Sequence, residues 1–231
     1  MLQHSIQPIT SLLKSPIQWT DYTWNPFHGC TKISDGCKFC YMYRNEERYK
    51  RNPSMLIRSS KPIFYRPYKI KEPSLIFTCS FSDFFHKEAD KIRHECWEII
   101  KNTPQHQYQI LTKRPERILE CLPPDWGNGY LNVWLGVSIE SEKYLFRWEK
   151  LKKIPAKIKF VSIEPLLENF TKFPDNPDWV IIGGESGNNN GNYRYRPCNL
   201  SNNRRLDVIP IPYWDNHQYN NLINLSIENT W

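Results

Sequence analysis

Short apolar runs alternate with amphipathic segments along most of the chain. Runs typical of buried strands cover residues 75–79, 108–112, 132–137, 157–163 and 179–183, and an irregular run covers 19–24. Segments with helical spacing lie at 84–101, 115–121 and 142–153, the first with Asp83 as its predicted N-cap. Strands that alternate with helices form βαβ units. We therefore predict an α/β fold with six parallel strands.

Polar residues follow the predicted strands. They are Ser80, Ser82 and Asp83 after the second strand, Lys113 and Arg114 after the third, and Glu140, Glu164 and Glu185 after the last three. Parallel α/β sheets place their chemistry at the carboxyl ends of the strands. No G-x-G-x-x-G turn follows the first strand, which argues against a Rossmann-type nucleotide fold. The pattern predicts that these side chains share one rim with the loop after the first strand.

That loop contains three closely spaced cysteines, Cys30, Cys37 and Cys40. A [4Fe-4S] cluster held by three thiolates leaves one iron open, whereas a structural zinc site needs four ligands. Two glycines in the loop allow the backbone to wrap closely around a bulky group. We expect an iron–sulfur cluster here. A zinc site completed by His28 or a distant cysteine, and ordinary buried thiols, are the alternatives.

The composition indicates a cytoplasmic protein. The chain has 231 residues, of which 39% are hydrophobic, with no run of about 18 apolar residues and no basic start followed by an apolar stretch. We therefore expect neither export nor a membrane. Cytoplasmic thiols stay reduced, so an odd count of seven cysteines favours metal chemistry over disulfides. Cys79, Cys96, Cys121 and Cys198 are expected to be ordinary buried thiols.

Most of the net charge of +7 lies in one segment that begins directly after Cys40. Residues 41–72 contain nine Lys or Arg and three Glu, a difference of +6, with several tyrosines and a phenylalanine among them. Basic side chains with interleaved aromatics suit a phosphate backbone and stacked bases. We therefore predict that the stretch 41–71 forms a surface that binds nucleic acid. The alternative is a solvated helix face that only keeps the protein in solution.

The cysteine trio after the first strand, the aromatic Phe39 before the third cysteine, and six βα units resemble the radical S-adenosylmethionine (SAM) superfamily. The spacing here is C-x6-C-x2-C, whereas that superfamily usually has C-x3-C-x2-C. The resemblance implies a partial (β/α)6 TIM-like barrel of the radical SAM type, with Cys30, Cys37 and Cys40 holding a [4Fe-4S] cluster whose open iron binds SAM. It further implies a 5′-deoxyadenosyl radical as the reactive species and a reductant protein as a partner.

The chain is also similar to a phage- and bacteria-encoded family of radical-SAM-like proteins of unknown function. The matching motifs lie at 19–26, through the cysteine loop, and at 80–86, 111–115, 135–140, 162–167 and 183–187. The resemblance covers about residues 15–197 and names no substrate.

The resemblance also implies roles for the rim residues. Ser80, Ser82 and Asp83 would hold the amino group or ribose of SAM. Lys113 and Arg114 would hold its carboxylate or a substrate phosphate, because fixed cations suit anions. Glu140, Glu164 and Glu185 would bond ribose hydroxyls or the ammonium group. For each glutamate, a salt bridge to a neighbouring Lys or Arg is the alternative.

The last segment departs from these patterns. Residues 199–231 contain eight Asn in 33 positions and no recognisable strand. We therefore divide the chain into a partial barrel, 1–197, and a divergent Asn-rich tail, 198–231. Two functions fit the sequence. The first is a radical-SAM-like iron–sulfur enzyme that acts on a nucleic acid or nucleotide. The second is a non-catalytic metal-binding protein, with zinc or an iron–sulfur cluster, that interacts with nucleic acid.

Overall fold

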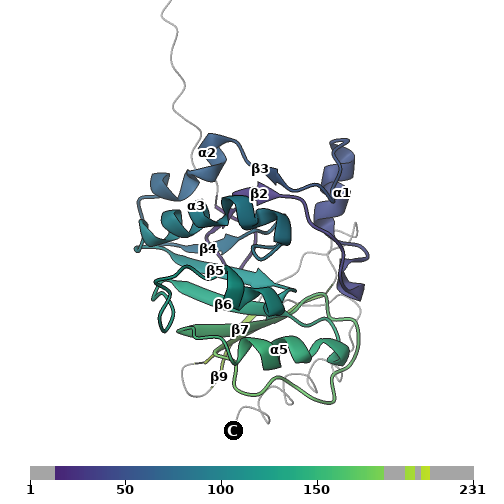
Figure 1. Cartoon of the computed structure of the whole chain (residues 1–231). Coiled ribbons are helices and arrows are strands. Elements are labelled where there is room, and N and C mark those ends of the chain that lie inside the picture. Colours follow the sequence, from purple (N-terminus) through teal and green to yellow (C-terminus); the bar gives the residue numbers. More distant parts are fainter. Residues whose placement is uncertain (1–13, 185–195, 201–203, 209–231) are drawn as a thin grey trace, which may run out of the picture.

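A parallel sheet forms the centre of the molecule, whose computed structural model describes residues 14–184, 196–200 and 204–208. Its six predicted strands are β1 (Tyr22–Trp24), β4 (Leu75–Thr78), β5 (Gln107–Thr112), β6 (Val133–Ser138), β7 (Ile158–Ile163) and β8 (Trp179–Ile182). They lie side by side in chain order and pair in parallel (Figure 1). A sheet with this order winds in one direction, as a barrel does, and does not reverse midway as a Rossmann fold does. The predicted six parallel strands are confirmed.

Two further strands extend the sheet beyond β8. β10 (Arg204–Val208) pairs with β8 in parallel, and β9 (Arg196–Leu200) pairs with β10 antiparallel. The sequence predicts no strand in 199–231, and β10 shows this prediction to be wrong. Its five residues include only two apolar ones, so main-chain pairing with the edge of β8 explains the strand better than any hydrophobic pattern. The predicted domain boundary at 197/198 falls inside β9. Among the described strands, β1 and β9 are the two edges and do not pair, so the barrel is open.

Helices pack against one face of the sheet. α3 (Asp90–Lys101), α4 (Ile118–Cys121) and α5 (Phe146–Leu151) each follow a short 3-10 turn: η3 (Lys87–Ala89), η4 (Pro115–Arg117) and η5 (Glu142–Tyr144). α3 and α5 are seen in front of the strands in Figure 1. Because α3 begins at Asp90 with Ala89 at its N-cap position, the prediction that Asp83 caps this helix is wrong.

The segment between β1 and β4 forms a separate layer that carries the cysteine loop. It contains β2 (Phe27–His28) and β3 (Ile57–Arg58), which pair antiparallel, and the helical elements η1 (Asp35–Cys37), α1 (Tyr41–Arg48), α2 (Lys61–Phe64) and η2 (Arg66–Lys69). α1 lies at the margin of the molecule, beyond the carboxyl ends of the strands (Figure 1).

Strand alternation gives the sheet two different apolar faces. The larger core, which includes Ile110, Val137 and Trp97, lies between the sheet and the helices. On the opposite face, Trp19, Phe77, Phe160, Trp179 and Ile181 form a second cluster. The ring centroids of Trp19 and Phe77 are 4.6 Å apart, and those of Phe160 and Trp179 are 5.0 Å apart. This aromatic cluster packs the inner face of the sheet, and two of its members, Trp19 and Phe77, also line the cavity described below.

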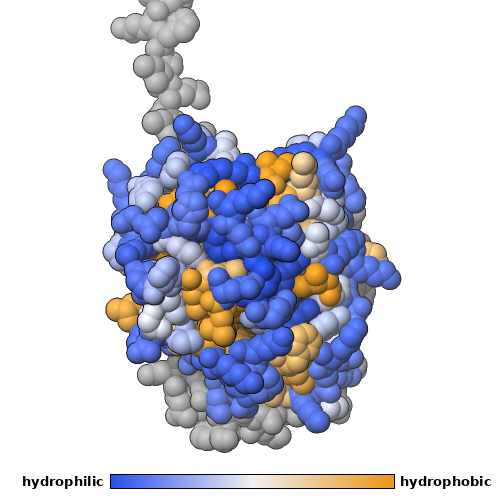
Figure 2. Space-filling view, viewed as in Figure 1, coloured by the Kyte–Doolittle hydropathy of each residue, from blue (hydrophilic) through white to orange (hydrophobic). Residues whose placement is uncertain are grey.

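Gly136 on β6 shows how tightly the inner face is packed. A Cβ at this position would lie 2.4 Å from Cζ of Phe160, so only glycine leaves room for the ring. The outer surface in the view of Figure 2 is mostly hydrophilic, with hydrophobic residues in separate patches. No helix within the described ranges combines the length and apolar character needed to cross a membrane.

Candidate active site

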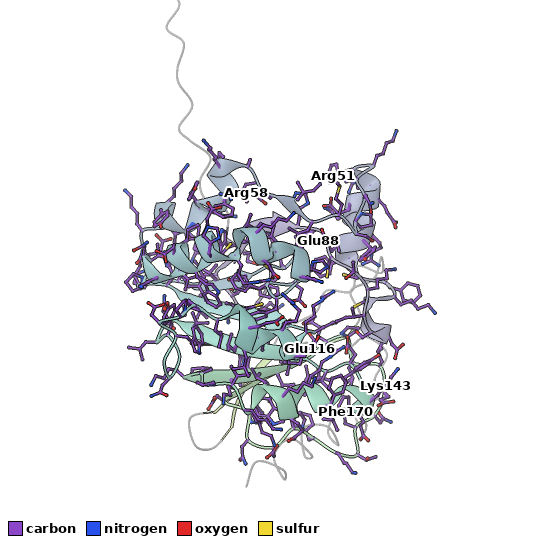
Figure 3. The ribbon with its side chains drawn as sticks, viewed as in Figure 1. Arg51, Arg58, Glu88, Glu116, Lys143 and Phe170 are labelled. Atoms are coloured by element: carbon purple, nitrogen blue, oxygen red, sulfur yellow. The ribbon has the colours of Figure 1, made fainter. Side chains whose placement is uncertain are left out.

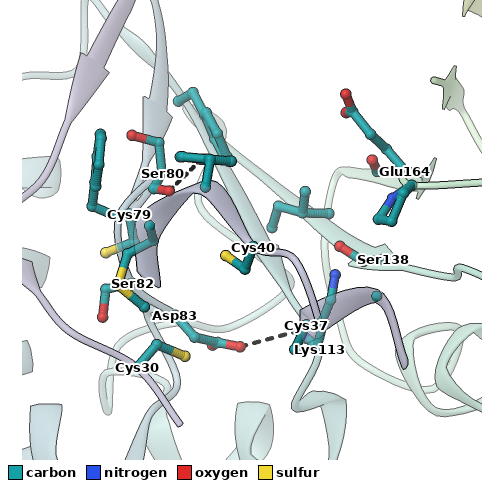
Figure 4. Close-up of a pocket in the computed structure, with 18 of the residues that line it drawn as sticks. Cys30, Cys37, Cys40, Cys79, Ser80, Ser82, Asp83, Lys113, Ser138 and Glu164 are labelled. Atoms are coloured by element: carbon teal, nitrogen blue, oxygen red, sulfur yellow. Dashed lines mark hydrogen bonds between the residues drawn. The ribbon is translucent and has the colours of Figure 1, made fainter. Parts of the chain in front are cut away.

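A cavity of about 1320 Å³ opens at the carboxyl ends of the strands. The cysteine loop forms one side of it and the strand ends form the other (Figure 4). Most of the predicted site residues line it: Cys30, Cys37, Cys40, Ser80, Ser82, Asp83, Lys113, Arg114 and Glu164. Glu140 lies directly behind this lining, where it contacts Lys113. Glu185 lies outside the described residues. The structure therefore brings the described members of the predicted set to one rim.

Asp83 and Arg114 form a buried ion pair that attaches the first cysteine to β4 and β5. Nη1 of Arg114 donates to Oδ2 of Asp83 at 2.9 Å, and both side chains are less than one tenth exposed. Nη2 of Arg114 donates to the carbonyl oxygen and hydroxyl of Thr31 at 2.8 and 2.9 Å, and Nη1 lies 3.5 Å from Sγ of Cys30. The hydroxyl of Thr112 completes the network by donating to Asp83 at 2.7 Å. A buried charge pair with this many hydrogen bonds fixes the loop in position.

Glu140 holds the second half of the cysteine loop. Its carboxylate is fully buried and accepts from the hydroxyl of Ser34 at 2.5 Å. Nζ of Lys113 lies 3.0 Å from one carboxylate oxygen, and Nη1 of Arg147 lies 2.7 Å from the other. Burial alone would raise the pKa of Glu140, but Lys113 and Arg147 hold it below its ordinary value. Gly36 packs against this side chain, because a Cβ there would lie 2.4 Å from Cγ of Glu140.

These four charged residues, Asp83, Lys113, Arg114 and Glu140, are called the clamped rim below, because each one pairs with an opposite charge. For Glu140, the salt-bridge alternative considered from the sequence is the arrangement observed. The clamped rim connects the cysteine loop to β4, β5 and β6. Its members position the loop, and Lys113 also faces the cavity with about one fifth of its side chain exposed.

Two predicted serines also fix the loop. Nδ2 of Asn25 donates to the hydroxyl of Ser80 at 3.0 Å, and the hydroxyl of Ser82 donates to the carbonyl oxygen of Gly29 at 2.6 Å. Gly29 has a φ of +99°, and a Cβ there would lie 2.1 Å from the carbonyl oxygen of Met55, so this position requires glycine. Sequence reasoning assigned no role to Asn25, Thr31 or Ser34. Their position in or next to the cysteine-loop motifs was the available signal.

The three cysteines line the cavity, but their side chains do not converge on one point as metal ligands do. Among the described residues, no group of three or more His, Cys, Asp or Glu side chains is arranged to hold a metal ion. Burial raises the pKa of the Cys30 thiol to about 12, and Arg114 offsets part of this rise. Their role as cluster ligands therefore stays a prediction.

The two histidines near the loop contact groups other than the cysteine thiols. Nδ1 of His28 lies 3.5 Å from Oε2 of the buried Glu46. Nε2 of His86 lies 3.1 Å from the hydroxyl of Thr31, and its Nδ1 accepts from the backbone N–H of Glu88. Cys79 is buried as predicted, but it also lines the cavity and has a φ of +65°, which the sequence did not indicate.

One wall of the cavity carries polar groups without partners. Ser162 is fully buried on β7, lines the cavity, and its hydroxyl has no hydrogen-bond partner. Glu164, two residues later on the same face, makes no hydrogen bond or ion pair with the residues that the structure describes, and Gly183 lies close beside it. Burial raises the pKa of Glu164 to about 7, although Lys113 acts to lower it. Ser162 and Glu164 are called the open wall below. Sequence reasoning missed Ser162, although a polar residue at an inward strand position was a signal for it.

Comparisons with known proteins agree with this fold. A family model described as "Protein of unknown function (DUF5131)" matches residues 14–202. No curated protein matches the chain. Among solved structures, a cysteine-to-serine mutant of spore photoproduct lyase is similar, with a TM-score of 0.52 and 12% sequence identity over 96% of this chain and 76% of that one. Together with the strand order, this likeness confirms the predicted α/β fold class, a partial (β/α)6 TIM-like barrel.

Proposed function

Because the chain belongs to the DUF5131 family, whose function is unknown, we propose an activity from its own site: a radical-SAM-like iron–sulfur enzyme that acts on a nucleic acid or nucleotide. One observation carries the proposal. The three cysteines come from one loop, line one cavity, and are fastened by the clamped rim to the carboxyl ends of a partial barrel. This is the edge at which βα barrels perform their chemistry.

The donor set suits a cluster held by three thiolates. Soft thiolates favour iron–sulfur or zinc. A four-ligand zinc site would need a further donor, and the ring nitrogens of His28 and His86 already lie against Glu46 and Thr31. When bound, the cluster and SAM would supply a 5′-deoxyadenosyl radical that abstracts hydrogen from a substrate. A reductant protein is the expected partner for this chemistry.

In this proposal, some residues of the rim hold the cysteine loop and others bind SAM. Asp83, Arg114 and Glu140 hold the cysteine loop through the contacts described above. Lys113 faces the cavity while Glu140 fixes its ammonium group, so in this proposal Lys113 holds the carboxylate of SAM. Ser80 and Ser82 keep the start of the loop in place. Glu185 keeps its predicted role as a SAM-binding residue.

The proposed nucleic-acid surface is the part of 41–71 next to the cavity. Tyr43 and Arg44 of α1 line the cavity mouth, and Arg48 and Lys50 follow as exposed cations. The later cations differ: Arg58 pairs with Glu95 and lies over the ring of Phe64. Arg51 and Arg58 lie in the α1 and β3 region at one end of the molecule (Figure 3). The strongest phosphate-binding candidates are therefore those of α1, where cations lie next to the opening.

The test is anaerobic reconstitution of the full chain with iron and sulfide. We expect about four iron and four sulfide per chain, broad absorption near the violet, and release of 5′-deoxyadenosine from SAM with a chemical reductant. Cys37→Ala should abolish iron binding. The controls Cys121→Ala and Cys79→Ala should retain it, since neither thiol belongs to the proposed ligand set. A folded, colourless protein with stoichiometric zinc would refute the proposal and favour the non-catalytic metal-binding alternative.

A further inference from the structure

The open wall is the part of the cavity that the fold itself does not use. On the clamped rim, every charge is matched by a partner within the chain. On β7, the hydroxyl of Ser162 is buried without a partner, and the carboxyl of Glu164 reaches the cavity with no bond to the described residues. Burying a hydroxyl without a hydrogen bond is unfavourable, so such a group in a ligand cavity suggests that a ligand supplies the missing partner.

We propose that the open wall recognises a guanine base of the substrate, with Glu164 accepting the N1–H and N2–H groups and the hydroxyl of Ser162 donating to O6. The inference rests on the proposed function and names the substrate class of the same cavity. It follows from the order of groups along β7 and directly after it: the Ser162 hydroxyl and the Glu164 carboxylate are two residues apart, and both residues line the cavity.

The chemistry of the other bases explains this choice. A carboxylate has two acceptor oxygens and binds best where two N–H donors lie side by side. Guanine offers N1–H next to N2–H, with the acceptor O6 beyond them. Adenine and cytosine place a ring nitrogen lone pair beside their amino group, and that lone pair would face the carboxylate. Uracil and thymine have one N–H between two carbonyl groups. Only guanine satisfies both oxygens of Glu164 and the hydroxyl of Ser162.

The rest of the cavity suits a flat ring attached to a phosphate. Trp19, Phe77 and Leu111 line it and offer apolar surface to the faces of a base. Tyr43 and Arg44 line the mouth, where the α1 cations would meet a phosphate group. A base that enters this deeply must come from a nucleotide, a single strand, or a base flipped out of a duplex.

The ionisation of Glu164 agrees with this role. Burial raises its pKa to about 7, and Lys113 acts to lower it. The nearby Tyr41 hydroxyl has a raised pKa, mainly because it is buried and to a smaller extent because of Cys40 and Glu164. Two N–H donors stabilise a carboxylate in its charged form. Guanine binding should therefore strengthen as the pH rises through 7.

The experiment measures equilibrium binding of guanosine, inosine and adenosine 5′-monophosphates to the full chain by calorimetry. Inosine lacks the N2 amino group and adenosine lacks the N1–H. We expect the guanine nucleotide to bind at least about tenfold more tightly than the adenine one, with inosine between them. Glu164→Gln should remove this preference, because its amide presents an N–H to the base. Ser162→Ala should weaken guanine binding and leave adenine binding unchanged.

The matched control is Glu98→Gln, an exposed glutamate on α3 outside the cavity, which should bind as the wild type does. Circular dichroism confirms that each variant is folded. Equal affinity for guanine and adenine nucleotides in the wild type, no binding of either, or an unchanged preference in Glu164→Gln would overturn the guanine site. Because this measurement needs neither cluster nor SAM, its result is separate from the reconstitution test: a guanine preference without iron binding would reject only the proposed radical chemistry.

Discussion

The clamped rim and the open wall each contain a glutamate at the same edge of one sheet, yet the two glutamates differ in their partners. Glu140 meets Lys113, Arg147 and Ser34, and it belongs to the internal structure of the site. Glu164, one strand further along, meets none of the described side chains in this way and faces the cavity. A fully buried charge with two ion-pair partners, such as Glu140, positions a loop, whereas an unpaired carboxyl that faces the cavity is available to a ligand. A role can therefore be assigned to a polar residue at a strand end only when its bonding partners within the fold are known.

The largest expected effect is a loss of stability when one charge of the clamped rim is removed. Glu140→Gln leaves Lys113 and Arg147 in a buried site without their counter-charge. Breaking one side of a buried ion pair costs about 3–5 kcal/mol of unfolding free energy. Urea denaturation measures this change. The exposed Glu116→Gln is the control and should change stability by less than about 0.5 kcal/mol. A loss below 1 kcal/mol at Glu140 would show that the clamped rim does not hold the loop.

The second effect is a loss of stability with rising pH that comes from Glu164 of the open wall. The pKa of Glu164 is raised from its ordinary value of 4.5 to about 7 in the folded protein. Below pH 4.5 the carboxyl is protonated in both the folded and unfolded states, so burial carries no penalty. As the pH rises from 4.5 through 7, the unfolded state releases the proton first, and the folded state loses up to about 3 kcal/mol of stability. Above pH 7 the loss is constant.

Glu164→Gln does not titrate and isolates this contribution. The difference in unfolding free energy between the variant and the wild type should grow in favour of the variant between pH 5 and pH 7.5. Urea denaturation at several pH values measures it. A difference that stays constant over this range would mean that Glu164 is not an uncompensated buried carboxyl, and the contrast with Glu140 would be lost.

The third prediction compares the cations of α1 with those of the clamped rim. Lys113 and Arg114 pair with carboxylates inside the site, whereas Arg44, Arg48 and Lys50 lie on the exposed surface of α1 and the turn after it, where a phosphate can reach them. Replacing Arg44, Arg48 and Lys50 together by Ala should weaken binding of a single-stranded oligonucleotide by about tenfold or more and lower its salt slope by up to about 2. Arg51 is left in place because it pairs with the buried Glu46.

The control for this variant removes the same number of exposed cations elsewhere: Lys91, Lys153 and Lys157. Fluorescence anisotropy at low and moderate salt compares the two triple variants with the wild type. Equal binding by all three proteins would favour the alternative interpretation of 41–71 as a solvated face.

The sequence predicted the edge of the sheet better than the role of each residue along it. Six apolar runs in alternation with helices were sufficient to give the parallel order, and the strand ends followed from it. β10 could not be predicted in this way, because pairing with the edge of β8 determines it. Asp83 was misread as a helix cap, because an aspartate before a helical pattern has that meaning locally, while its partners Thr112 and Arg114 come from another strand.

The same limit explains the glutamates. Glu140 and Glu164 both follow an apolar strand directly, and nothing local separates them. What separates them is tertiary: Arg147 on α5 and Ser34 in the cysteine loop reach Glu140, and no described side chain reaches Glu164 in the same way. Both glutamates lie at the predicted rim, and only the packing shows that Glu140 is already bonded to other side chains. The cluster-ligand role of the three cysteines rests on their spacing and awaits the reconstitution test.

The smallest expected effect compares two hydroxyls of the site, one that is bonded within the fold, on Ser80, and one in the open wall, on Ser162. Ser80→Ala removes the oxygen that Asn25 binds, so a half-buried amide loses a partner and the protein should lose about 1 kcal/mol of stability. Ser162→Ala removes a hydroxyl that has no partner, so the penalty of burying it disappears and stability should be unchanged or rise by up to about 1 kcal/mol. Urea denaturation of both variants measures the difference in sign. If Ser162→Ala destabilised the protein as much as Ser80→Ala, its hydroxyl would already be bonded within the fold and would not be available to a ligand.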